Sequence, residues 1–299
     1  MAFEFSSGIV LTWIHLAVLL AGLPLLVTWI ARLIEQRGLG LPVDGAWGDV
    51  CWGRVAGGFE FVIVCVAVHL LLSTGLSFCL GPLDLPHWSD GAAAGLVQAL
   101  AMCGQWAVTC GLLLAWVLLH ARGRLATVGL TASRFWKSLA AGAAGFLAIM
   151  PAVLVALFTA WFIYQLFNAE PPGEHPVLAA VSQSRDPWMI AAYFVVAGLL
   201  IPFFEELFYR GLIQTTLMRT GSAAMAIVLT SLLFGLAHLP MDNGPVGAPA
   251  VTVLALGLGY VYYRTRSLWA PVTLHALFNL YNLTLTVAAP ALTEYLNRL

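Results

Sequence analysis

The sequence predicts an all-α protein, a polytopic transmembrane bundle of about eight helices. Its residues are 61% hydrophobic and 9% charged, and its mean hydropathy is +0.91. Soluble domains are only about 45–50% apolar and about 25% charged. Apolar runs of roughly 20 residues, the length of a bilayer-spanning helix, recur along the chain. This composition excludes a soluble globular domain, and the net charge of −1 offers nothing for nucleic acid.

Each predicted helix is an apolar run bounded by polar or charged residues. The first run lacks a basic segment before it and a small-residue cleavage site after it, so we expect a retained anchor rather than a signal peptide. We expect the fifth helix to continue beyond its apolar core, to about residue 219. The eight predicted spans are 8–31, 57–80, 92–120, 137–167, 188–210, 222–240, 246–263 and 268–289.

The longest polar stretch, residues 168–187, contains four prolines and divides the chain into two predicted halves. Residues 1–187 form a four-helix membrane half without a recognised motif. Residues 188–299 form a second half that contains nearly all the strong polar signals within predicted spans. We therefore expect the chemistry to lie in the second half.

Basic residues are distributed unevenly between the two sides of the predicted bundle. Eleven of the thirteen Lys and Arg residues fall on one side, and only Arg185 and Arg298 fall on the other. Because cytoplasmic loops are enriched in Lys and Arg, we expect the basic side in the cytoplasm and both termini outside. The expected location is the bacterial cytoplasmic (inner) membrane.

The fifth predicted span contains three charges within six positions: Glu205, Glu206 and Arg210. Each charge in a membrane helix costs roughly 2.5–3.5 kcal/mol on insertion scales, so such residues indicate function. Glu206 and Arg210 are four residues apart and can form an ion pair. Glu205 lies about 100° around the helix, where it can face a cavity and act as a general base. The alternative is a purely structural ion-pair network.

Two later spans also place polar groups on one helical face. Phe234 and His238 are four residues apart in the sixth span, and His275 and Asn279 are four apart in the eighth. Peptide-bond hydrolysis fits this set: Glu205 would accept a proton from water, and a histidine would orient that water. His275 and Asn279 would donate hydrogen bonds to the oxyanion. No Ser or Cys stands beside a base, so we expect no acyl-enzyme.

Two points about this set stay open. The same Glu, His and His could instead bind Zn²⁺, although the HExxH pattern is absent. Simple counting along each helix places the three residues at different depths, so they must converge through helix tilt or a kink at Pro202 or Pro271. We predict that the three converge, and Glu205 more than about 10 Å from both histidines would count against an enzyme, since catalysis requires direct or one-water contact.

The motifs EExxxR (Glu205, Glu206, Arg210), FxxxH (Phe234, His238) and HxxxN (His275, Asn279), in this order on successive helices, resemble the CPBP family. That family comprises type II CAAX prenyl endopeptidases and Abi-type, bacteriocin-processing membrane proteases. The resemblance covers residues 200–282. It implies that the first Glu is the catalytic base, that the FxxxH histidine assists water activation, and that the last His and Asn stabilise the oxyanion. Glu206, Arg210 and Phe234 would support them.

We therefore expect an intramembrane endopeptidase that hydrolyses a membrane-associated peptide or protein, with CAAX-type processing as one form of this activity. The alternative is a non-catalytic peptide-binding protein, of the immunity or chaperone kind, that uses the same cavity. A transporter would also place Glu and His in the membrane, but it should show inverted repeats. The sequence leaves the substrate, its prenylation, any metal, the oligomeric state and the role of the first half undetermined.

Overall fold

The computed structural model describes residues 16–31, 58–80, 91–120, 125–167 and 173–296, and these residues form helices without any strand. The predicted all-α membrane bundle is confirmed. The helices are Leu16–Ala31, α2 (Gly58–Leu80), α3 (Ala92–His120), α4 (Phe135–Phe167), α5 (Pro176–Ser182), α6 (Pro187–Val195), α7 (Ile201–Glu206), α8 (Thr215–Thr220), α9 (Ala223–His238), α10 (Gly244–Thr265) and α11 (Trp269–Leu296), with a short 3₁₀ helix, η4 (Leu125–Val128), before α4.

Helical segments of the described residues coincide with all eight predicted spans. Four of them are long and apolar enough to cross a membrane, namely Ala92–Leu119, Phe135–Phe167, Pro187–Thr220 and Gly244–Thr265. The short helix α5 was not predicted and lies inside the expected loop 168–187. Residues 1–15, 32–57 and 297–299, which include both ends, lie outside the described residues.

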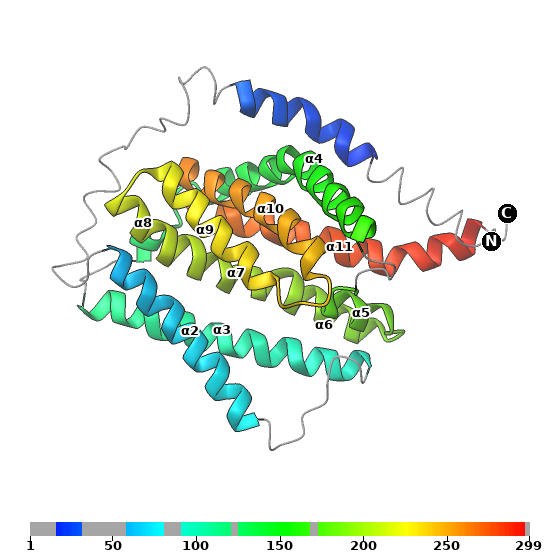
Figure 1. Cartoon of the computed structure of the whole chain (residues 1–299), viewed down its shortest axis with the longest axis horizontal. Coiled ribbons are helices and arrows are strands. Elements are labelled where there is room, and N and C mark those ends of the chain that lie inside the picture. Colours follow the sequence, from blue (N-terminus) through cyan, green and yellow to red (C-terminus); the bar gives the residue numbers. More distant parts are fainter. Residues whose placement is uncertain (1–15, 32–57, 81–90, 121–124, 168–172, 297–299) are drawn as a thin grey trace.

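The helices surround the segment that contains the glutamates (Figure 1). On one side α4 packs against α10 and α11, and α10 packs against α9; on the other, α3 contacts α5, α6 and α7. Gly142 and Gly145 of α4 allow the close approach of α11 and α10, since a Cβ at Gly145 would lie 2.9 Å from both Leu274 and Val261. The division of the chain at residue 187 remains a prediction, and α4 contacts the second half directly.

The fifth predicted span is one continuous helical stretch from Pro187 to Thr220, interrupted twice by π-helix. The π segments, η5 (Val196–Leu200) and η6 (Leu207–Gln214), lie on either side of α7, which holds both glutamates. Single π turns inside α-helices occur frequently at functional sites. The expected continuation to about residue 219 is confirmed by the end of α8 at Thr220.

Pro202 explains a free carbonyl in the first π segment. The N–H of Ile201 bonds to the oxygen of Val196, five residues earlier. In the same register the next bond would join residue 202 to the oxygen of Ala197, but proline has no N–H. The side chain of Asn279 donates to that oxygen instead, at 2.8 Å. A backbone acceptor released by Pro202 therefore holds α11 against the glutamate helix.

Candidate active site

Glu206, Arg210 and His275 form a buried polar cluster, which we call the inner cluster. Arg210 Nη1 donates to Glu206 Oε1 at 3.0 Å, and neither side chain has any exposed surface. His275 Nδ1 donates to the same oxygen at 2.8 Å. The spacing of four residues predicted the Glu206–Arg210 pair, but the sequence did not indicate the contact between His275 and Glu206.

The Arg210 guanidinium has two further partners in this cluster. Its Nη2 donates to the backbone oxygen of Ala255 in α10 at 3.3 Å. Its Cζ lies 4.8 Å from the ring centre of Phe234, a cation–π contact. Burial of a charge is tolerated when it is paired and hydrogen-bonded. These contacts give partners to Arg210 Nη1 and Nη2 and to Glu206 Oε1, whereas Arg210 Nε and Glu206 Oε2 have no hydrogen-bond partner among the described residues. The inner cluster thus joins the glutamate helix to α9, α10 and α11.

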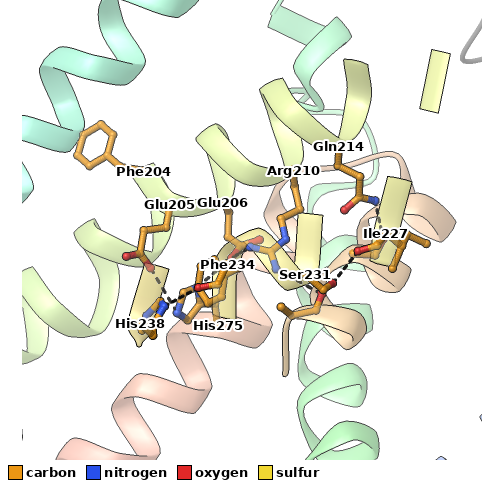
Figure 2. A network of polar contacts seen from close by, with 12 residues as sticks. Phe204, Glu205, Glu206, Arg210, Gln214, Ile227, Ser231, Phe234, His238 and His275 are labelled. Carbon is orange, nitrogen blue, oxygen red and sulfur yellow. Dashed lines mark hydrogen bonds and ion pairs between the residues drawn. The ribbon is translucent and has the colours of Figure 1, made fainter. Parts of the chain in front are cut away.

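Glu205 lies at the margin of this cluster rather than inside it. Its side chain is 12% exposed, and its Oε2 lies 3.7 Å from His275 Nε2. The opposite nitrogen of the same ring contacts Glu206, so His275 stands between the two carboxylates (Figure 2). The spacing of adjacent residues on a helix separates the glutamates, as expected, and only Glu205 can reach water or a substrate.

His238 is the last residue of α9, and its backbone fixes the tautomer of its ring. Its Nδ1 lies 2.7 Å from the backbone oxygen of Phe234, an atom that can only accept, so Nδ1 carries the proton. In the neutral ring Nε2 is then an acceptor. Figure 2 places this imidazole below the Glu205 carboxylate, close enough for the charges of the two groups to interact. The neutral His238 ring therefore offers one acceptor nitrogen on the side of the site where Glu205 lies.

Phe234 acts as the spacer between these polar groups. It is fully buried, and its ring centre lies 4.7 Å from that of His238 and 5.7 Å from that of His275. The same ring receives the Arg210 guanidinium. One aromatic side chain thus fixes the positions of both imidazoles relative to the inner cluster.

The structure brings together the glutamates and both predicted histidines. The contact of Glu205 with His275 lies well within the predicted 10 Å. Asn279, one turn beyond His275, is committed through one N–H to Ala197, which leaves its second N–H for another acceptor. Sequence reasoning missed His175, which precedes α5 and interacts electrostatically with His238. A histidine followed by proline at a helix start was the available signal.

The ring nitrogens that remain free decide which residues could hold a metal ion. Among the residues that the structure describes, no group of three His, Cys, Asp or Glu side chains is arranged to hold an ion. His275 Nδ1 and His238 Nδ1 are committed to protein oxygens, which leaves the Nε2 atom of each ring free. A bound zinc ion would take these Nε2 atoms and Glu205 as ligands and would activate water there. The chemical steps below describe what the protein side chains themselves do.

Comparisons with known proteins point to membrane peptidases. Residues 187–281 match the family described as Type II CAAX prenyl endopeptidase Rce1-like. A protein of Bacillus subtilis (strain 168) described as "Putative membrane peptidase YdiL" is 23% identical over 87 residues, which is 29% of this chain and 34% of that protein. The chain thus matches about a third of the length of this relative. No solved structure matches the chain.

Proposed function

We propose that the protein, an integral membrane protein, is an intramembrane endopeptidase of the CPBP family, since residues 187–281 match the Type II CAAX prenyl endopeptidase Rce1-like family. The observation that carries the proposal is the position of His275 between two carboxylates, 2.8 Å from enclosed Glu206 and 3.7 Å from accessible Glu205. A fixed imidazole next to a carboxylate that can reach water supports proton transfer.

In the first step, Glu205 takes a proton from a water molecule whose other proton is bonded to His238 Nε2. The water oxygen forms a bond to the carbonyl carbon of the peptide, and the electron pair of the C=O π bond moves to the carbonyl oxygen. Since His238 Nδ1 is held by the Phe234 oxygen, its Nε2 stays directed at the water. General-base assistance of this kind contributes about 10²–10⁴-fold.

In the second step, the proton passes from Glu205 to His275 Nε2, which then donates toward the substrate. Glu206 stabilises the resulting imidazolium through Nδ1–H. This new N–H, with the second N–H of Asn279, stabilises the oxyanion. His275 then gives this proton to the amide nitrogen, the C–N bond breaks with its electron pair on nitrogen, and an electron pair of the oxyanion re-forms the C=O bond. The products are a carboxylic acid and an amine.

The substrate is a membrane-associated peptide, and the basic residues suggest the side from which it arrives. Arg219 ends α8 and Arg264 ends α10, at the end of the bundle opposite His238, because α9 runs away from α8 and α10 returns. With the basic end in the cytoplasm, His238 lies toward the outer side. His275 lies six residues after the start of α11, which follows the basic end of α10. The site residues therefore come from both ends of the bundle, and a peptide within the membrane fits better than a soluble cytoplasmic one.

Labelling tests this orientation. In a variant with all five cysteines replaced, we expect Glu174→Cys to react with a membrane-impermeant maleimide in intact cells. Lys137→Cys should react only after permeabilisation, since Lys137 lies at the start of α4, at the basic end. The reverse pattern would place the site toward the cytoplasm and would favour a CAAX-type substrate.

The activity is tested by comparing new peptide N-termini in cells that express the wild type or Glu205→Gln. We expect at least one membrane-associated cleavage product that is present with the wild type and lost with the variant. The corresponding internally quenched peptide, and a farnesylated CAAX peptide, are then supplied to the purified protein in nanodiscs. Retained binding of such a peptide by the wild type without any cleavage would support the peptide-binding alternative.

A further inference from the structure

His175 is placed by the helix that follows it. It is the N-cap of α5, and its Nδ1 accepts a hydrogen bond from the backbone N–H of Val177 at 3.3 Å. Pro176 follows at the first helical position, where a missing N–H costs nothing. A nitrogen that accepts from N–H carries no proton, so the proton of the neutral ring is on Nε2. His175 therefore presents an N–H donor on its far side.

The segment before α5 lies against the turn that follows His238. A Cβ built at Gly173 would lie 2.7 Å from Asp242 Cβ and 3.1 Å from the Asp242 backbone oxygen. Asp242 belongs to the turn between α9 and α10, in which Met241 N–H donates to the His238 oxygen at 3.3 Å. Helix α5 itself packs against α3 and against α11, the helix of His275 and Asn279. The segment that carries His175 thus lies beside the end of the site formed by His238.

The charge state of His175 agrees with this position. Burial, with the charge of His238 as a second cause, lowers the pKa of His175 to about 4. The His175 ring is therefore neutral at physiological pH, so it carries no positive charge that would oppose protonation of His238. It remains a donor through Nε2–H under all conditions in which Glu205 is a useful base.

The three imidazoles differ in what they offer a substrate. His238 and His275 both hold their proton on Nδ1, directed at Phe234 and at Glu206, so Nε2 of each neutral ring is an acceptor. Only His175 has the opposite tautomer. Before any proton has moved, Glu205 and the Nε2 atoms of His238 and His275 can only accept. The second N–H of Asn279 and the Nε2–H of His175 are then the donors available to the carbonyl oxygen that must become negative.

We propose that His175 Nε2–H is one of these donors and binds the carbonyl oxygen of the scissile peptide bond from the outer side of the site. The inference rests on the proposed endopeptidase function. His175 would polarise the carbonyl before attack, and His275 Nε2–H and Asn279 would complete the oxyanion site as the proton is transferred.

Two substitutions separate this role from helix capping. In His175→Asn the amide lies near the position of Nδ1 and keeps an N-cap acceptor for α5, but it cannot reach the site. In His175→Gln the amide lies near the position of Nε2 and keeps an N–H donor toward the site, but it caps poorly. The proposal predicts that the Gln variant is the more active one, and a pure capping role predicts the reverse order.

The assay measures cleavage, by purified protein in nanodiscs, of the internally quenched peptide copied from the site that Glu205→Gln cells fail to cut. We expect kcat to fall roughly 10²–10³-fold in His175→Asn, as for loss of one oxyanion donor, at an unchanged thermal midpoint. His175→Gln should retain at least tenfold more activity than His175→Asn. Equal activities, or higher activity of the Asn variant, overturn the proposal.

A measurement without substrate tests the role of His175 separately from the proposed endopeptidase function. In ¹⁵N-histidine-labelled protein, we expect His175 as the Nε2–H tautomer and His238 as the Nδ1–H tautomer at pH 7, each identified by its loss in the corresponding Gln variant. An Nδ1–H tautomer at His175 overturns the proposal even if the wild type is an active protease. Failure of the wild type to cleave, with Glu205→Gln unchanged, instead defeats the proposed function on which this inference rests.

Discussion

Two regions of the site, the inner cluster with Glu206 and the margin with Glu205, contain adjacent residues yet have opposite environments. Glu206 is fully enclosed and paired with Arg210 and His275, whereas Glu205 retains 12% exposure and has only the longer contact of 3.7 Å with His275. Buried ion pairs contribute little net stability but are costly to break. The difference indicates that Glu206 holds His275 in position, whereas Glu205 takes the proton from water. The predictions below test this separation of roles.

The largest effect is expected at His275, because it belongs to both regions. His275→Leu should lower kcat by about 10²–10⁴-fold, as for loss of a proton-transfer group. It should also leave Glu206 Oε1 without one partner, at a cost of about 1–3 kcal/mol. Peptide cleavage and thermal unfolding in detergent measure the two effects. His69→Leu, in α2, is the histidine control, and equal loss of activity in both variants would contradict the assignment.

Breaking the Glu206–Arg210 ion pair should mainly lower the stability of the folded protein. Arg210→Met leaves the enclosed Glu206 charge without its cation, and loss of one partner of a buried pair costs about 3–5 kcal/mol. The double variant Glu206→Gln/Arg210→Met removes both charges and should recover part of this loss in the thermal midpoint. Additive losses in the double variant would show that the two side chains do not act as a pair.

The Asn279–Ala197 bond should have a smaller effect, which can be rescued. Asn279→Ala leaves the Ala197 oxygen without a donor, which costs about 1–3 kcal/mol for a buried acceptor. Pro202→Ala restores the backbone N–H that the π register directs at this oxygen. We expect Pro202→Ala/Asn279→Ala to unfold at a higher temperature than Asn279→Ala. No recovery would mean that Pro202 is not the reason the carbonyl is free.

The smallest effect is expected at Phe234, which separates the two regions. Phe234→Leu keeps an apolar side chain but loses the cation–π contact with Arg210, worth about 0.5–2 kcal/mol. Unfolding in detergent should show a loss of this size, and kcat should fall only severalfold, because His238 keeps its bond to the residue 234 backbone. A loss as large as that of His275→Leu would show that the ring itself takes part in catalysis.

Local spacing predicted more of the fold than of the site. The spans follow from runs of apolar residues, and the Glu206–Arg210 pair follows from a separation of four residues on a helix. Three features depend on tertiary packing and left no such pattern: the contact of His275 with Glu206, the bond from Asn279 to Ala197, and the approach of His175 to His238. Helix α5 was missed because seven residues beside several prolines give too little periodicity to read.

The positions of the site residues along the membrane normal were also poorly predicted from the sequence. Counting residues from helix ends placed His275 far from Glu205, since such counting treats each helix as straight and uniformly wound. The π segments on either side of α7 change the winding where the glutamates lie. Nothing in the hydropathy of Val196–Leu200 or Leu207–Gln214 indicated them.

The most direct test compares Glu205→Gln with Glu206→Gln in one preparation, measuring the single-turnover cleavage rate and the thermal midpoint of each. The account predicts that Glu205→Gln loses about 10²–10⁴-fold in rate and unfolds at the wild-type temperature. Glu206→Gln should unfold at a clearly lower temperature. Cleavage by Glu205→Gln at nearly the wild-type rate would contradict the account, because the proton of the attacking water would then be taken up elsewhere.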